Sequence, residues 1–143
     1  MNSSLSYSPA EIAAVAHSIL AEAAQKRCRL FTLQGDLGAG KTTLCKALFE
    51  ELGCKEPVIS PTYAYMNKYQ GYDADIYHFD LYRLSSELAF YQAGFDEYIG
   101  RPDSYVFLEW PEIINEVLQE QVVCRIYISY ENELSRLIRW EVL

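Results

Sequence analysis

The sequence predicts an α/β fold, built from layers, with parallel strands first and an antiparallel pair at the C-terminal end. Strand-like apolar segments, such as residues 28–35 and 104–112, alternate along the chain with segments of helical spacing. The last segment, residues 121–143, alternates apolar and polar residues on both sides of a polar turn at 131–135. That pattern is typical of two antiparallel strands joined by a turn.

The first two helices have clear start and stop signals. A helix over residues 8–26 begins with Ser8 as a suitable cap, and Glu11 completes a capping box three residues later. A helix over residues 41–53 follows the strand at 28–35 and ends at Gly53, because glycine readily adopts the left-handed conformation that terminates helices.

The rest of the chain completes the alternation of strands and helices. Residues 54–71 are rich in proline and turn residues but contain β-prone pieces. The further elements predicted are a strand in 75–84 that ends in an acid, a helix over 85–100 capped by Ser85 or Ser86 and broken near Gly94, the strand in 104–112, and a helix over 111–118 begun by Pro111.

Composition limits the function classes. The 143 residues are predicted to form one domain, residues 1–143, and half of them are apolar, which is enough for a packed core. The net charge of -8 repels phosphate backbones, so direct nucleic-acid binding is not expected. Four cysteines without CxxC spacing indicate reduced thiols, and no apolar stretch reaches the length of a membrane span. We therefore expect a soluble cytoplasmic protein.

A glycine-rich segment, GDLGAGKTT, lies between the strand and the helix that follows it. It matches the pattern GxxxxGK[ST], in which bare backbone amides and a helix N-terminus surround phosphates. The lysine reaches the β- and γ-phosphates, and the first threonine ligates Mg²⁺. The residues predicted to contact the nucleotide are Gly35, Asp36, Leu37, Gly38, Ala39, Gly40, Lys41, Thr42 and Thr43.

Two acidic residues follow apolar strands. Asp80 and Glu109 are both predicted to lie at the carboxyl edge of the sheet, where α/β proteins bind ligands. One of them would hold a metal-bound water and the other would orient the attacking water. The competing interpretation is a solvated strand end, or an ion pair with Arg83.

Three further residues have two interpretations each. Thr62, in the turn Ser60-Pro61-Thr62, either lies in a loop over the γ-phosphate or belongs to an ordinary turn. His78 shares a strand face with Asp80 and either reaches the site or packs in the core. Trp110 either stacks near the nucleotide or fills the core.

The segments GDLGAGKTT, SPTYAY, HFDLYRL and FLEWPE, in this order and spacing, resemble the bacterial TsaE family. The resemblance is good over residues 8–112 and loose in the tail. The glycine loop is shared by many families, whereas HFDLYRL together with EWPE is much more specific. One segment departs from the family: serines stand at 85 and 86 where a proline-acid pair is usual.

The resemblance implies a P-loop NTPase-like three-layer sandwich with a mixed, mostly parallel sheet. It implies a weak Mg²⁺-dependent ATPase of tRNA N6-threonylcarbamoyladenosine biosynthesis that works with the TsaB–TsaD pair and meets tRNA only indirectly. Lys41 and Thr42 fall on the phosphate and metal positions, and Glu109 falls on the metal side. Asp80 and Thr62 fall on the motif aspartate and on a switch-like threonine, so these two and Glu109 are the predicted catalytic residues.

The residues alone bear on three other functions. A small-molecule kinase needs an acceptor pocket and several arginines to neutralise the transferred phosphoryl group. Between the glycine loop and Glu109 the chain has only Arg83 and Arg101. A GTPase would read guanine through NKxD, but Gln70 replaces that aspartate in Asn67-Lys68-Tyr69-Gln70. A nucleotide-gated adaptor without productive hydrolysis is not separated from a slow ATPase by sequence.

Overall fold

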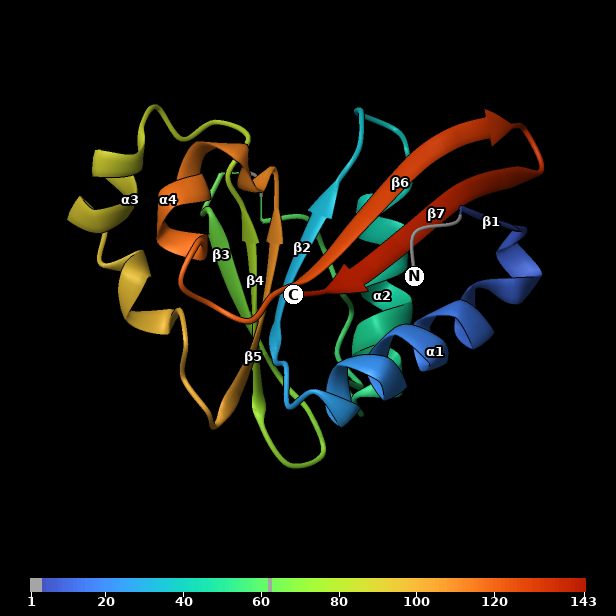
Figure 1. Ribbon diagram of the computed structural model, residues 1–143, viewed down its shortest axis with the longest axis horizontal. Helices are drawn as coiled ribbons and strands as arrows, with labels where there is room; N and C mark the ends of the chain where they lie inside the picture. Colours follow the sequence, from blue (N-terminus) through green and yellow to red (C-terminus); the bar gives the residue numbers. More distant parts are fainter. Residues whose placement is uncertain (1–3, 62) are drawn as a thin grey trace.

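Seven strands form one mixed sheet in the computed structural model, which describes residues 4–61 and 63–143 (Figure 1). Their order across the sheet is β1-β7-β6-β2-β5-β4-β3. The α/β class predicted from the sequence is confirmed. The strands are β1 (Leu5–Tyr7), β2 (Leu30–Gln34), β3 (Met66–Gln70), β4 (Asp75–Asp80), β5 (Ser104–Glu109), β6 (Cys124–Asn132) and β7 (Ser135–Val142).

The centre of the sheet is parallel and its margins are antiparallel. Strands β6, β2, β5 and β4 pair in parallel, whereas β3 pairs antiparallel with β4, and β7 with β6 and β1. Parallel neighbours require long crossover connections, and helices supply them here. The predicted C-terminal antiparallel pair is therefore correct, with a turn in which Leu134 N–H donates to Asn132 Oδ1 at 2.8 Å.

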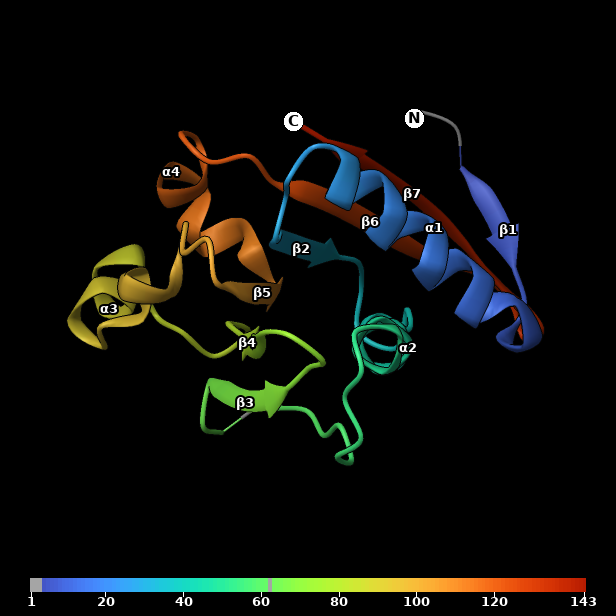
Figure 2. The same cartoon turned by 90° about the horizontal axis from the view of Figure 1, so that it is seen from below.

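Helices cover both faces of the sheet, as the view in Figure 2 shows. Helices α1 (Ile12–Gln25) and α2 (Lys41–Glu51) lie on one face, and α3 (Glu87–Gln92) and α4 (Asn115–Leu118) lie on the other. The three-layer arrangement implied by the family resemblance is confirmed.

The predicted start signal of the first helix and the predicted stop signal of the second are both found in the structure. Ser8 donates through both its backbone N–H and its hydroxyl to Glu11 Oε1, each at 2.9 Å, which forms the expected capping box. The first turn after Ser8 is a 3₁₀ turn, and the α-helix follows it. At the end of α2, Gly53 has φ +96°, the left-handed conformation that was expected to stop this helix.

The two later helices are each divided: the first near Gly94, as the sequence predicts, and the second contrary to the prediction. Ser86 caps α3 by accepting a hydrogen bond from Ala89 N–H at 3.1 Å, but Gly94 (φ +78°) separates this helix from a 3₁₀ turn. The helix expected over 111–118 begins as a 3₁₀ turn and becomes α-helical only at Asn115. The break at Ile114 (φ −119°, ψ 31°) leaves both Ile114 and Leu118 fully buried.

The core has one cluster on each face of the sheet. On the α1 and α2 side, aromatic rings dominate: the rings of Phe31 and Phe107 stack with centroids 4.5 Å apart, and Phe49 meets Phe107 edge-on at 4.9 Å. On the α3 and α4 side, Phe79 and Phe90 lie at the centre. Neighbouring residues of one strand therefore point into different clusters, as the two-residue period of a strand requires.

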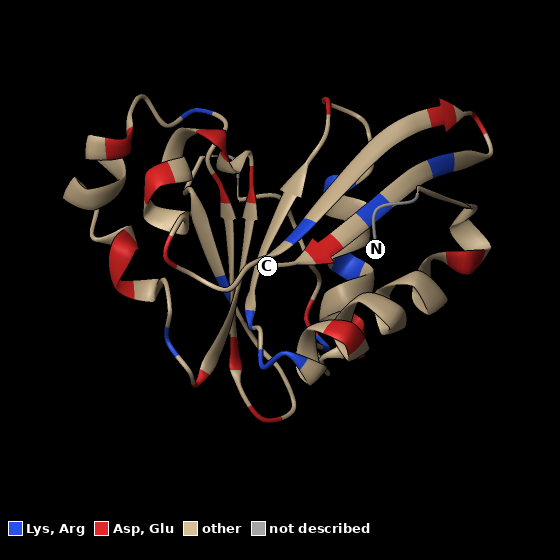
Figure 3. Ribbon diagram, viewed as in Figure 1, with Lys and Arg blue, Asp and Glu red and all other residues tan. Residues whose placement is uncertain are grey.

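Charged residues lie outside these clusters with a few exceptions at the end of the central strands. Figure 3 shows acidic residues on α1, α3 and α4 and at strand ends, with basic residues on the β6–β7 hairpin among other places. In the part of the chain that the structure describes, no helix combines the length and apolarity needed to cross a bilayer.

The aromatic stack generates a stability prediction. Replacing Phe107 by alanine (Phe107→Ala) leaves a cavity beside two rings, so we expect a loss of about 3–5 kcal/mol in the free energy of unfolding. Urea denaturation followed by fluorescence measures it. The matched control is Leu134→Ala, at a residue 78% exposed, for which a change within about 0.5 kcal/mol is expected. Equal losses in both variants would contradict this account of the core.

Candidate nucleotide and metal site

The glycine loop connects the end of β2 with the start of α2. Gly38 and Gly40 have φ +79° and +108°, conformations that residues with side chains rarely adopt, and Gly40 caps the helix. Gly35 is needed for a different reason, because a Cβ atom there would lie 2.4 Å from the carbonyl oxygen of Ile128 on β6. The loop is thus seated closely on the neighbouring strand, with the N-terminus of α2 beside it.

Lys41 is buried in this loop, with 6% of its surface exposed. Its ammonium donates to the carbonyl of Gly35 and, at 3.2 Å, to that of Asp36. Burial lowers the pKa of this ammonium from its ordinary value, and nearby carboxylates, Glu109 first among them, oppose the shift. The positive charge therefore lies at the point where a bound phosphate chain would meet the loop.

The two predicted acids lie at the same edge of the sheet. Asp80 ends β4 and Glu109 ends β5, and they are direct partners in the parallel register. Both are largely buried, at 7% and 3% exposed. Asp80 accepts a hydrogen bond from Tyr82 N–H at 3.0 Å and one from the Ser60 hydroxyl at 3.4 Å. Their expected position is confirmed, and their chemical roles stay predictions.

Thr42 and Glu109, the two predicted metal ligands, lie in contact with each other. The Thr42 hydroxyl lies 3.2 Å from each carboxylate oxygen of Glu109. Mg²⁺ prefers oxygen ligands in an octahedral shell of about 2.1 Å radius, in which adjacent ligands are about 3 Å apart. The donor type and the spacing therefore both fit Mg²⁺.

These residues surround a cavity of about 520 Å³. Gly35 and Ala39 do not line it: Gly35 faces Ile128, and Ala39 donates its N–H to Asp36 within the turn. The cavity brings together most of the predicted site, namely Asp36, Leu37, Gly38, Gly40, Lys41, Thr42, Thr43, Asp80, Glu109 and Trp110. Thr62 lies outside the described residues, so its predicted role has no structural description here.

Four lining residues were not predicted as site residues: Ser60, Tyr82, Arg83 and Arg136. Arg136 comes from β7, far along the sequence, and donates to the backbone carbonyls of Asn132 and Ser135 at 2.9 and 3.0 Å. Nothing in the alternating pattern of the tail marks this arginine. For Ser60, Tyr82 and Arg83, proximity to the SPT and HFD segments was the available signal.

Trp110 lies in the site beside Lys41. Its ring centroid is 3.8 Å from the Lys41 ammonium and 4.8 Å from the ring of Tyr82. It adopts a left-handed conformation with φ +58°, which is uncommon for a bulky residue. Trp110 therefore lines the cavity and belongs to neither core cluster, and its contact with a nucleotide stays a prediction.

His78 also belongs to this part of the molecule. It is fully buried, and its Nε2 lies 2.5 Å from Glu109 Oε2. Both interpretations of His78 therefore hold: it packs in the core and it reaches the site through Glu109.

A larger cavity, of about 860 Å³, lies at the other end of the central strands. It is lined by residues that precede β2 and β5, among them Arg29 and Arg101, and by residues of α1 such as Leu20. No residue of the glycine loop reaches it. We place the site in the smaller cavity because the loop, the buried lysine and both acids meet there.

Comparison with known proteins identifies a family and several relatives of this chain. The sequence profile of the family described as "Threonylcarbamoyl adenosine biosynthesis protein TsaE" matches residues 6–138. The chain is 37% identical over 113 residues to "tRNA threonylcarbamoyladenosine biosynthesis protein TsaE" of Bacillus subtilis, covering 79% of this chain and 68% of that protein. A Rickettsia conorii protein of the same name is 38% identical over 92 residues, 64% of this chain and 51% of its own length.

A solved structure is similar over nearly the whole chain. The crystal structure of YdiB from Bacillus subtilis superimposes with a TM-score of 0.72 at 30% sequence identity, covering 98% of this chain and 86% of that one. By contrast, the matched region spans between 51% and 62% of the length of the rickettsial relatives.

The close seat of Gly35 generates a prediction. In Gly35→Ala the new methyl group would collide with the Ile128 carbonyl, so the loop must shift away from β6 and the melting temperature should fall by about 5 °C or more. The control is Gly38→Ala, where no atom lies within 4 Å and only the backbone strain of about 1 kcal/mol is added. Differential scanning calorimetry compares them, and a smaller effect at Gly35 than at Gly38 would contradict the packing argument.

Proposed function

This chain belongs to the TsaE family of threonylcarbamoyl adenosine biosynthesis proteins, and from this premise we propose that it binds ATP with Mg²⁺ and hydrolyses the nucleotide. In this proposal the hydrolysis supports the TsaB–TsaD pair, which transfers the threonylcarbamoyl group to adenosine 37 of tRNA. The observation that carries the proposal is the meeting of a glycine loop, a buried lysine and two buried strand-end acids in one cavity.

Each residue has a role that its position supports. The loop amides and the Lys41 ammonium would bind the β- and γ-phosphates, and the N-terminus of α2 would favour their negative charge. The Thr42 hydroxyl and the Glu109 carboxylate would hold Mg²⁺, which supplies charge neutralisation during phosphoryl transfer. Asp80 ends the adjacent strand and would hold or orient a water molecule near the γ-phosphate. Trp110 would border the phosphate chain beside Lys41.

Two features support ATP hydrolysis over the other nucleotide functions. The Asn67-Lys68 pair that resembles the start of a guanine-reading motif lies on β3, where Lys68 pairs with Asp75 at 3.6 Å and Asn67 donates to the Ile59 carbonyl at 3.3 Å. These side chains are engaged within the β3–β4 region. The cavity of about 520 Å³ has the size of a site for one small ligand, which disfavours a kinase with a separate acceptor pocket.

The acidic surface supports a protein partner rather than RNA as the direct contact. With a net charge of -8, the chain repels the phosphate backbone at long range. In the proposed assembly, other subunits hold the tRNA and this chain supplies ATP turnover.

Binding and turnover should respond differently to substitutions. Lys41→Ala removes a charged donor to the phosphates, so ATP affinity measured by calorimetry should fall about 10- to 100-fold. Glu109→Gln and Asp80→Asn preserve shape but remove a carboxylate, so phosphate release should fall about 10²-fold or more while ATP still binds. Normal turnover in both acid variants would overturn these roles, and ATP binding without turnover in the unaltered protein would favour the adaptor.

The partner proposal has its own test. The chain is immobilised and incubated with purified TsaB and TsaD in the presence of ATP, of ADP, or of no nucleotide. We expect capture of the pair to depend on which nucleotide is present, because the site would adopt different arrangements with and without the γ-phosphate. The Lys41→Ala variant serves as control: with nucleotide kept near the dissociation constant of the unaltered chain, this variant binds little of it and should capture nearly equally under all three conditions. Capture that is independent of nucleotide in the unaltered chain would contradict the proposed coupling.

A further inference from the structure

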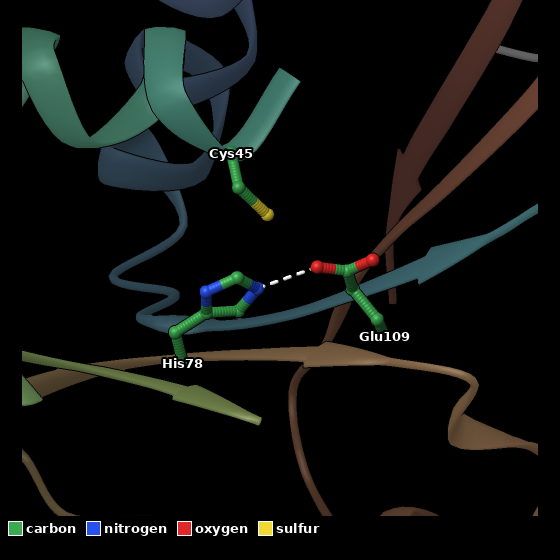
Figure 4. Close-up of side chains that lie close together, drawn as sticks. All are labelled: Cys45, His78 and Glu109. Atoms are coloured by element: carbon green, nitrogen blue, oxygen red, sulfur yellow. Dashed lines mark hydrogen bonds and ion pairs between the residues drawn. The ribbon is translucent and has the colours of Figure 1, made fainter. Parts of the chain in front are cut away.

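A buried histidine contacts the carboxylate that faces Thr42. His78 is 0% exposed, and its Nε2 lies 2.5 Å from Glu109 Oε2. Figure 4 shows the imidazole and the carboxylate directed toward each other. A carboxylate only accepts hydrogen bonds, so with Glu109 ionised the imidazole Nε2–H must donate. This is a charge-assisted hydrogen bond between two side chains that are both buried away from water.

The sheet places the two residues side by side. In the parallel register of β4 and β5, His78 lies opposite Phe107, and Asp80 lies opposite Glu109. Since side chains repeat every two residues along a strand, all four point to the face covered by α2. His78 is therefore one strand away from Glu109 and two residues before it in register, which brings its ring to the buried side of the carboxylate.

Packing holds the imidazole in this orientation. The ring of Phe49, on α2, meets the imidazole edge-on with centroids 5.2 Å apart. Within the described residues, Nδ1 of His78 has no hydrogen-bond partner. The only polar contact of the ring found in this region is therefore the one to Glu109, so this contact accounts for a polar group in an otherwise apolar cluster.

A metal site was the alternative explanation. Donor atoms of Cys45, His78 and Glu109 all lie within 4.8 Å of one another. However, burial raises the pKa of the Cys45 thiol well above its ordinary value, and the carboxylate of Glu109 raises it further. Both carboxylate oxygens of Glu109 are also already engaged, Oε1 by the Thr42 hydroxyl and Oε2 by His78 Nε2.

We propose that His78 is a positioning residue that fixes the orientation in which Glu109 faces Thr42 and the cation of the bound nucleotide. The proposal rests on the function proposed above. Without the imidazole donor, the Glu109 carboxylate, which is 3% exposed, would keep only its contact with the Thr42 hydroxyl among these hydrogen bonds. It would then rotate toward another hydrogen-bond donor, because a buried charge with few partners is unfavourable. Outer residues that orient metal ligands in this way typically change metal affinity or activity by about 10- to 100-fold.

Three substitutions at one position separate the hydrogen bond from packing. His78→Phe keeps the ring and its contact with Phe49 but has no donor. His78→Gln carries an amide N–H near the place of Nε2, whereas the amide of His78→Asn falls near the place of Nδ1, which has no partner. We therefore expect the order of function to be His78, then His78→Gln, then His78→Asn and His78→Phe.

The measurement uses Mn²⁺ as a probe of the cation site. Mn²⁺ is titrated into the protein–ATP complex and followed by electron paramagnetic resonance, and ATP binding without metal is measured by calorimetry. In His78→Phe and His78→Asn, Mn²⁺ affinity should fall about 10- to 100-fold, with metal-free ATP binding within about twofold. His78→Gln should recover most of the Mn²⁺ affinity. Equal Mn²⁺ affinity in all three variants and the unaltered protein would overturn the inference.

Two controls keep the outcome interpretable. Cys45→Ala removes a buried neighbour from the same cluster, and it should lower the melting temperature without changing the Mn²⁺ affinity. In a Glu109→Gln background, His78→Phe should cause no further loss, because the two residues act as one unit. An additive loss in that background would show a purely structural effect of His78. If the unaltered protein binds neither ATP nor Mn²⁺, the proposed function fails, and this outcome differs from equal binding in every variant.

Discussion

The parallel pairing of β2, β5 and β4 is the constraint on which the site depends. Parallel strands in register end at one edge, so the glycine loop after β2, Glu109 at the end of β5 and Asp80 at the end of β4 meet there. These residues lie far apart in sequence, and no local structure could bring them together. This edge of the sheet therefore brings together the buried ammonium of Lys41 and the buried carboxylates of Asp80 and Glu109.

Burying these charges is costly, and the surrounding contacts offset the cost. Lys41 donates to two carbonyls of its own loop, Asp80 accepts from a backbone amide and a hydroxyl, and Glu109 accepts from Thr42 and His78. A buried charge without hydrogen-bond partners is strongly unfavourable. Each charged group is therefore held in the orientation in which it keeps these hydrogen bonds. The same low-polarity surroundings that make the arrangement costly strengthen its interaction with a bound polyphosphate.

The C-terminal hairpin, β6 and β7, contacts the glycine loop and contributes one residue to the lining of the cavity. Strand β6 extends the parallel centre of the sheet beyond β2, and its Ile128 carbonyl lies against Gly35. Strand β7 carries Arg136 to the cavity, where its guanidinium Nε would lie 4.0 Å from a Cβ at Gly40. The hairpin thus contributes Arg136 to the lining of the cavity and supports the glycine loop through Ile128.

The sequence by itself determined the fold class, the first helix with its Ser8–Glu11 box, the glycine loop and the two strand-end acids, because these depend on local periodicity, capping and backbone freedom. Only the tertiary structure decided the strand order, the break of the last helix at Ile114, the short strand β1, the hydrogen bond between His78 and Glu109, and the presence of Arg136 in the cavity. The reason is physical: strand pairing and burial join residues that are distant in the chain, and a local pattern contains no information about which distant partner a residue will meet.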